Sequence, residues 1–319
     1  MTGREVFLSN GQLRPIWRCL LSTLLIAAAY VLGGLALVFV FHGLGRRPQV
    51  FEGLFWHSAL MVPALLGIFK FMTAVFDRRP LTAVGLAFHS RWRAELIRGL
   101  VVGAVMILLV AGTEAALGLA HFSLSAEAPI RMVKGGLLLG FLLLVAATNE
   151  ELTFRGYPFQ RLMDSLGPVG AIAVFSALFG LGHLMNPDHT WISTVNTMLV
   201  GVPLALAYVR TRALWLPIGI HLSWNFLQGY ALGLPVSGLV LPARILAPVV
   251  SGPWWVTGGA YGPEGGVLTS GVIVAATFYL LASRRIYITE DMKKLVVGPP
   301  PQAEAPVSSL SLAGSAEER

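Results

Sequence analysis

Two adjacent carboxylates, Glu150 and Glu151, follow a run of apolar residues that is long enough to lie in a membrane helix. One acidic side chain at the centre of a membrane helix costs roughly 2.5 to 3.5 kcal/mol in insertion experiments. A pair of them therefore needs a reason other than folding, and ionisable residues inside a membrane are candidate functional residues. The alternative is a solvated helix end, because Arg155 begins a more polar stretch.

The spacing of these charged residues separates the two glutamates. Neighbouring residues of a helix point about 100° apart, whereas residues four apart share a face. Glu151 can therefore pair with Arg155, while Glu150 is free to face a cavity. We expect the ion pair to support a site at which Glu150 does the chemistry.

Two histidines and an asparagine lie on later apolar stretches. His183 follows Phe179 by four residues and Asn225 follows His221 by four, so each pair shares a helix face. His183 could instead be an interfacial residue near a helix end, and His221 and Asn225 could only bond neighbouring helices. If Glu150 activates a water molecule, His183 could hold that water. His221 and Asn225 could then donate hydrogen bonds to an oxyanion.

Several motifs of other proteases are missing from the sequence. There is no HExxH zinc motif, no GxSxG motif and no pair of aspartates in the apolar stretches. The single cysteine, Cys19, excludes an intramolecular disulfide and a cysteine-based zinc site. No metal is therefore favoured, although Glu150, His183 and His221 could supply a His₂Glu zinc site. We favour a structural interpretation for three isolated polar residues, Glu114, Lys70 and His189.

The composition is that of a membrane protein. Of the 319 residues, 55% are hydrophobic and only 12% are charged, and the mean hydropathy is +0.71. Soluble domains carry about 25% charged residues. The net charge of +7 fits basic residues at membrane flanks. We therefore expect a multi-pass protein that contacts the lipid bilayer and binds no nucleic acid.

Apolar runs of spanning length predict an all-α fold, a polytopic transmembrane bundle of about eight helices. We expect one domain over residues 1–285, with its motif core at 134–232, and a disordered cytoplasmic tail over 286–319. Glu150 would then lie near the centre of its helix. The eight helices are expected at residues 18–42, 54–76, 96–120, 134–163, 168–186, 191–209, 213–232 and 267–283.

The basic residues predict the orientation of this bundle. With the N-terminus inside, the inner segments hold 17 of the 23 Lys and Arg residues and the outer segments hold five. Cytoplasmic segments carry an excess of Lys and Arg. We expect both termini to be cytoplasmic, and the membrane to be a bacterial plasma membrane.

Three short motifs, taken in order, resemble those of the CPBP intramembrane protease family. That family includes type II CAAX prenyl endopeptidases and bacteriocin-processing or self-immunity proteins. The resemblance covers about residues 134–232 and implies a membrane-embedded peptidase site in a bundle of about eight helices. The motifs are Glu150-Glu151-x-x-x-Arg155, Phe179-x-x-x-His183 and His221-x-x-x-Asn225.

The resemblance also implies a role for each motif residue. Glu150 would be the general base, and His183 would help to bind the attacking water. His221 and Asn225 would form the oxyanion hole. The two remaining motif residues, Glu151 and Arg155, would support the site.

The expected function is therefore that of an intramembrane endopeptidase. Its substrate would be a membrane-associated protein or peptide, with CAAX-type processing implied by the resemblance alone. The alternative is a non-catalytic transporter or an immunity-type binding protein that uses the same buried polar residues as a relay. Transporters often contain repeated halves, and the sequence contains no such repeat.

Overall fold

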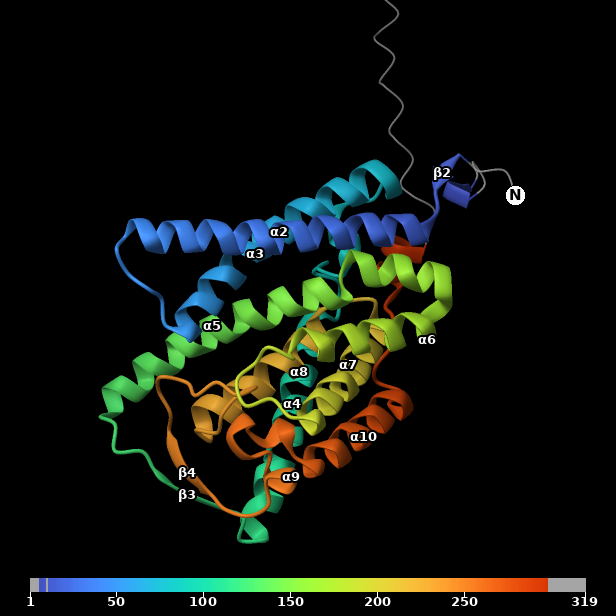
Figure 1. Ribbon diagram of the computed structural model, residues 1–319. Coiled ribbons are helices and arrows are strands. Elements are labelled where there is room, and N and C mark those ends of the chain that lie inside the picture. The colour runs from blue at the N-terminus through green and yellow to red at the C-terminus, as the bar shows by residue number, and fades with distance from the viewer. Residues whose placement is uncertain (1–5, 10, 298–319) are drawn as a thin grey trace, which may run out of the picture.

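Long helices dominate the computed structural model, which describes residues 6–9 and 11–297 (Figure 1). The expected all-α polytopic bundle is confirmed. Two of the helices, α2 and α5, begin at a proline, whose missing N–H costs nothing in the first turn. The long helices are α2 (Pro15–Gly43), α3 (Val50–Met72), α4 (Trp92–Ala116), α5 (Pro129–Arg155), α6 (Tyr157–Gly182), α7 (Trp191–Thr211), α8 (Trp215–Phe226) and α10 (Val267–Ala282).

Short elements join and flank these helices. The strand β3 (Ala120–Leu124) pairs in antiparallel fashion with β4 (Leu246–Val250), and β1 (Leu8–Ser9) pairs with β2 (Gln12–Leu13). The remaining elements are single turns that shape the connections. They are η1 (Thr73–Asp77), η2 (Leu81–Val84), η3 (Leu227–Ala231), α9 (Trp254–Thr257), η4 (Gly259–Tyr261), η5 (Pro263–Gly265), α11 (Glu290–Met292) and η6 (Lys293–Val297).

The described residues contain five helical stretches that are long and apolar enough to cross a membrane. One of them, Pro129–Gly182, combines the expected fourth and fifth helices. The expected seventh helix is the 12-residue α8 followed by the turn η3, and the expected eighth is the 16-residue α10. The protein is an integral membrane protein with several spanning helices, and the count of eight stays a prediction.

The expected fourth helix, 134–163, is wrong at its C-terminal end. The helix α5 stops at Arg155, because Gly156 adopts a non-helical ψ of −146° and Pro158 lies in the first turn of α6. Glu150 therefore lies five residues before the last residue of α5, not at the centre of a helix. The helix α6 also has a kink at Gly167, where φ is 72°.

The helix α5 lies between two groups of helices (Figure 1). On one side it packs against α3, which pairs with α2, and on the other side it packs against α8. The helix α8 lies close along α4, since a Cβ added at Gly99 would be 2.9 Å from the Cα of Gly219. Small residues permit such close approach between membrane helices. This contact fixes the part of α8 that carries His221.

The C-terminal segment contacts the rest of the protein as far as Leu295. We expected a disordered tail from residue 286, but residues 290–297 form α11 and η6, and the side chain of Met292 is fully buried. The guanidinium of Arg79 donates to the carbonyl of Leu295, and the backbone N–H of Ser90 donates to Asp291 at 3.2 Å. Residues 298–319 of the expected tail lie outside the described residues.

Candidate active site

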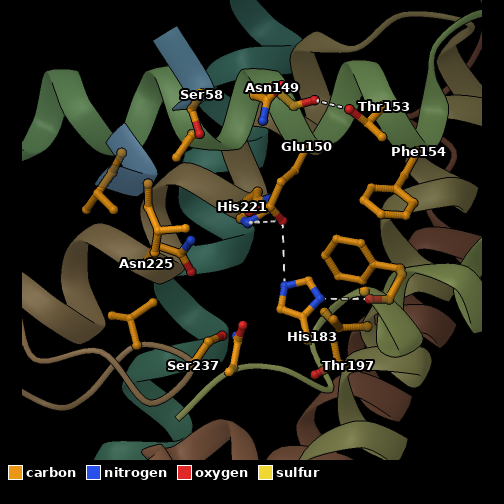
Figure 2. Close-up of a pocket in the computed structure, with 18 of the residues that line it drawn as sticks. Ser58, Asn149, Glu150, Thr153, Phe154, His183, Thr197, His221, Asn225 and Ser237 are labelled. Atoms are coloured by element: carbon orange, nitrogen blue, oxygen red, sulfur yellow. Dashed lines mark hydrogen bonds and ion pairs between the residues drawn. The ribbon is translucent and has the colours of Figure 1, made fainter. Parts of the chain in front are cut away.

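A cavity of about 590 Å³ lies beside the C-terminal part of α5. Four of the predicted site residues line it, and they come from α5, the end of α6 and α8 (Figure 2). Apolar side chains of α2, α3 and α5 form one part of the wall, and polar side chains of α7 and of the loop before α10 form another. The four site residues are Glu150, His183, His221 and Asn225.

The carboxylate of Glu150 faces two histidine rings across this cavity. Its Oε2 atom lies 3.8 Å from Nε2 of His183 and 3.7 Å from Nε2 of His221 (Figure 2). The side chain of Glu150 is 30% exposed, and its Oε2 has no hydrogen-bond partner among the described residues. This carboxylate is therefore held open toward the cavity, as the helix spacing predicted.

The carboxylate of Glu151 points away from the cavity into the protein. Its Oε1 accepts a hydrogen bond from Nη1 of Arg155 at 3.1 Å, and both side chains are almost fully buried. Nη2 of Arg155 donates to the carbonyl of Gly201 at 3.2 Å, which ties α5 to α7. The predicted ion pair is thus present.

Glu151 has a second partner that the sequence did not predict. Its Oε1 also lies 2.9 Å from Nδ1 of His221, so one carboxylate holds both Arg155 and a histidine of the site. The contact joins α5 to α8, and spacing along a single helix contains no signal for a bond between two helices. Glu151 therefore orients His221 as well as neutralising Arg155.

The hydrogen bonds of the two histidines determine which ring nitrogen carries hydrogen. Nδ1 of His183 lies 2.7 Å from the carbonyl of Phe179, and a carbonyl can only accept, so this Nδ1 is the donor. By the same argument, Nδ1 of His221 donates to the carboxylate of Glu151. Each neutral ring then turns the lone pair of Nε2 toward Glu150. Two lone pairs and a carboxylate thus make three acceptors here, and the two hydrogens of one water molecule can serve two of them.

The ring of Phe179 packs among the charged residues of the site. Its centroid lies 4.8 Å from that of His183 and 6.2 Å from that of His221, and the guanidinium carbon of Arg155 lies 4.6 Å from the ring centroid. An aromatic face attracts a cation. Phe179 therefore supports the site through its carbonyl, its ring packing and its contact with Arg155.

Asn225 lies one helical turn after His221 and lines the same wall of the cavity (Figure 2). Its side-chain amide makes no hydrogen bond to another described residue, so both N–H groups are available to a ligand. All six predicted site residues thus meet around one cavity, four of them on its wall and two, Glu151 and Arg155, behind it.

The cavity also contains polar residues that the sequence analysis did not single out. The hydroxyl of Tyr30 on α2 lies 3.1 Å from Oδ1 of Asn149 and 2.9 Å from the hydroxyl of Thr153, on either side of Glu150 in the sequence. His57 on α3 donates from Nε2 to the carbonyl of Tyr30 at 3.1 Å. Tyr30 and His57 are polar residues within the expected spans 18–42 and 54–76, and this position could have marked them as candidate site residues.

A second carboxylate, Glu264, lines the cavity from the loop before α10. Burial raises the pKa of this carboxyl, and hydrogen bonds from Ser237 and Trp224 act in the opposite direction. The sequence placed Glu264 in a Gly/Pro-rich loop without periodicity, so nothing marked it as a site residue. By contrast, three polar residues given a structural interpretation are not among those that line the cavity, namely Glu114, Lys70 and His189.

The spacing of the donor atoms is wider than that of a tetrahedral zinc site. Ligand atoms of a tetrahedral zinc ion with bonds of about 2.1 Å lie about 3.4 Å apart. Here Glu150 is 3.7 and 3.8 Å from the two histidines. In the part of the chain that the structure describes, no three His, Cys, Asp or Glu side chains are placed to hold a metal ion.

A protein-family model matches residues 132–227 of the chain. The match is to the type II CAAX prenyl endopeptidase Rce1-like family. The matched segment runs from α5 to the end of α8 and contains all six predicted site residues, so the resemblance seen in the motifs is confirmed over this segment. The Rce1-like family implies a membrane protease, a hydrolase that acts on a membrane-associated protein. No curated protein and no solved structure gives a significant match to the chain.

Proposed function

We propose that this protein is an intramembrane endopeptidase that hydrolyses a peptide bond of a membrane-associated protein or peptide, in the manner of a CAAX protease. The observation that supports this most is the position of Glu150, which lies open to a cavity within 4 Å of two oriented histidines. The Rce1-like match supports the same reaction class. A cavity with an apolar wall inside a helical bundle suits a substrate that arrives within the bilayer.

In the proposed reaction, Glu150 is the general base. A water molecule donates one hydrogen to Glu150 and the other to Nε2 of His183, and its oxygen attacks the carbonyl carbon of the scissile bond. Glu150 takes the proton from this water. It then gives that proton to the nitrogen of the leaving amine as the C–N bond breaks. The products are a new carboxylate and a new amine.

The oxyanion of the tetrahedral intermediate needs hydrogen-bond donors, and we assign His221 and Asn225 to this task. Nδ1 of His221 is committed to Glu151, so Nε2 donates only when the ring is protonated. The negative charge of Glu151 stabilises such an imidazolium. Asn225 donates from its side-chain amide. In this proposal Glu151 and Arg155 act by holding His221 in place.

No metal takes part in the proposed reaction. This proposal follows from the missing HExxH motif and from the spacing of the three candidate donors, which does not suit tetrahedral zinc. We also propose that both termini are cytoplasmic and that the membrane is a bacterial plasma membrane. The excess of Lys and Arg in the expected inner segments supports the orientation.

The test is cleavage by the purified protein. The wild-type protein, reconstituted in lipid vesicles, is incubated with a membrane-anchored peptide library, and the products are identified by mass spectrometry. We expect discrete cleavage sites near the membrane-proximal ends of some peptides. If no peptide is cut but the vesicles show a proton or ion flux that depends on Glu150, the protein is a transporter and the proposal is wrong.

A further inference from the structure

Glu264 makes three hydrogen bonds through its side chain. Its Oε2 accepts from the backbone N–H of Ser237 at 2.6 Å and from the hydroxyl of Ser237 at 2.7 Å. Its Oε1 accepts from the indole N–H of Trp224 at 3.1 Å. Glu264 lies in η5, outside the matched segment 132–227, yet it lines the same cavity as Glu150.

The first two bonds stabilise an unusual turn at residues 236–239. Ser237 has a φ of 48° and Gly238 has a φ of 83°, and the residues on either side of them form a β-bridge. A left-handed conformation is strained for a serine, because its Cβ approaches the carbonyl oxygen that follows. The two bonds to Glu264 offset this cost, so the carboxylate determines the shape of the turn.

This turn presses against the segment that follows His183. A Cβ added at Gly238 would overlap the carbonyl of Pro187, so the two backbones are in close contact. Pro187 lies only four residues after His183, and Ser237 and His183 both line the cavity (Figure 2). The turn thereby limits how far His183 can move away from Glu150.

The third bond acts on α8. Trp224 directly precedes Asn225 and lies three residues after His221, so holding its indole fixes the rotation of α8 at the site. The backbone of the same loop is also anchored. The carbonyl of Glu264 accepts from the side-chain amide of Asn196 on α7 at 2.8 Å.

We propose that Glu264 is a positioning residue, which holds His183 and Asn225 at their working distances across the cavity from Glu150. The inference rests on the proposed function and adds to it a residue outside the motif core. Glu264 touches neither the scissile bond nor the water in this proposal. It acts through the turn at 236–239 and through Trp224.

The test compares Glu264 with a second glutamate of the described residues, Glu114. Glu264→Gln keeps the size of the side chain but replaces one carboxylate oxygen by an NH₂ group. That NH₂ group then faces an N–H or O–H donor of Trp224 or Ser237 and cannot accept its hydrogen bond. Glu114→Gln is the matched control, because Glu114 is 1% exposed and does not line the cavity. A displacement of about 1 Å in an active site can cost about 100-fold in rate. We expect kcat to fall about 10- to 100-fold in Glu264→Gln with KM nearly unchanged, and no fall in Glu114→Gln.

A second variant guards against misfolding. Trp224→Phe keeps an aromatic ring but removes the indole N–H together with part of the ring volume, and we expect a smaller loss of kcat in a protein that still folds and melts cooperatively. The double variant Glu264→Gln/Trp224→Phe should lose less kcat than the product of the two single losses. The reason is that both substitutions affect the same hydrogen bond, from Trp224 to Glu264.

The outcomes separate this inference from the proposed function. Wild-type kcat in Glu264→Gln and in Trp224→Phe, in a protein that cleaves peptides, overturns the inference alone. The inference is also overturned if kcat falls only in proportion to the amount of folded protein. It is overturned as well if Glu114→Gln lowers kcat to the same extent. If the wild-type protein cuts no peptide, both proposals fail together.

Discussion

Glu150 and Glu151 are neighbours in the sequence but have opposite surroundings. Glu151 is fully buried and binds both Arg155 and His221 through one oxygen, whereas the side chain of Glu150 is 30% exposed and faces the cavity. An ionisable side chain that faces a cavity inside a membrane protein is a candidate functional residue. The difference between the two residues follows from the 100° that separates neighbouring positions on a helix.

The first prediction concerns the buried ion pair. Glu151→Gln leaves Arg155 buried without its carboxylate, and breaking a buried pair costs roughly 3–5 kcal/mol. We expect a lower melting temperature and lower expression, with part of both recovered in the double variant Glu151→Gln/Arg155→Gln. The control is Glu52→Gln, which breaks the exposed pair with Arg46 and should change stability by less than about 1 kcal/mol. A Glu151→Gln protein as stable as the wild type would contradict this role.

The second prediction concerns metal. The proposed reaction uses Glu150 as a base, so cleavage should continue at an undiminished rate after exhaustive treatment with EDTA or phenanthroline. Peptide cleavage is measured before chelation, after it, and after addition of zinc. Loss of activity that zinc restores would show that Glu150, His183 and His221 are metal ligands, instead of the base, the residue that binds the water and the oxyanion donor.

At the scale of helices, two breaks in the backbone position the site. The first, at Gly156, ends α5 five residues after Glu150. The second, at Gly167, interrupts α6, and the part of α6 after it runs back, so that His183 at its C-terminal end reaches the cavity (Figure 1). The backbone changes at two glycines therefore bring His183 back to Glu150.

The third prediction tests the first of these breaks, at Gly156. Gly156→Ala introduces a Cβ that would lie 2.7 Å from the ring of Phe69 and would overlap the carbonyl of Leu152. Overpacking of this kind costs about 1–3 kcal/mol. We expect a lower melting temperature and a large loss of cleavage. Gly112→Ala is the control, because a Cβ added at Gly112 meets nothing within 4 Å and alanine favours a helix. Equal effects of the two substitutions would argue against the break as a constraint on the site.

The sequence predicted the helices better than the connections between them. Apolar runs and i, i+4 spacing located the helices and paired Glu151 with Arg155, because both signals act along a single helix. The break at Gly156 was missed, although Gly156 and Pro158 are residue types that commonly end a helix. The bond from His221 to Glu151 and the contacts of Glu264 join distant segments, and no local pattern encodes them.

At the scale of the whole molecule, the cavity divides into an apolar wall and a polar wall. Helices α2 and α3, which lie outside the matched segment 132–227, provide much of the apolar wall together with α5. The exposed faces of α2 carry large apolar side chains such as Leu24, Val31 and Phe39, as expected for contact with lipid. The bundle can thus present a polar reaction site to a substrate that stays in the membrane.

The fourth prediction concerns orientation. Both termini should be cytoplasmic, because the expected inner segments contain 17 of the 23 Lys and Arg residues. Reporter fusions at residues 10 and 300 should report inside, and a fusion at residue 127, between β3 and α5, should report outside. An external signal at either terminus would refute this topology. If only one terminus were external, the number of spans would be odd.

The most direct test of the account compares wild-type protein with Glu150→Gln, both purified from the same membranes. Gln keeps the shape of the side chain but cannot take a proton from water. Groups of this kind contribute about 10²- to 10⁴-fold to the rate. We predict that Glu150→Gln loses at least 10²-fold in peptide cleavage, keeps the wild-type melting temperature and still binds the substrate peptide. A Glu150→Gln protein that cleaves at the wild-type rate would contradict the central claim.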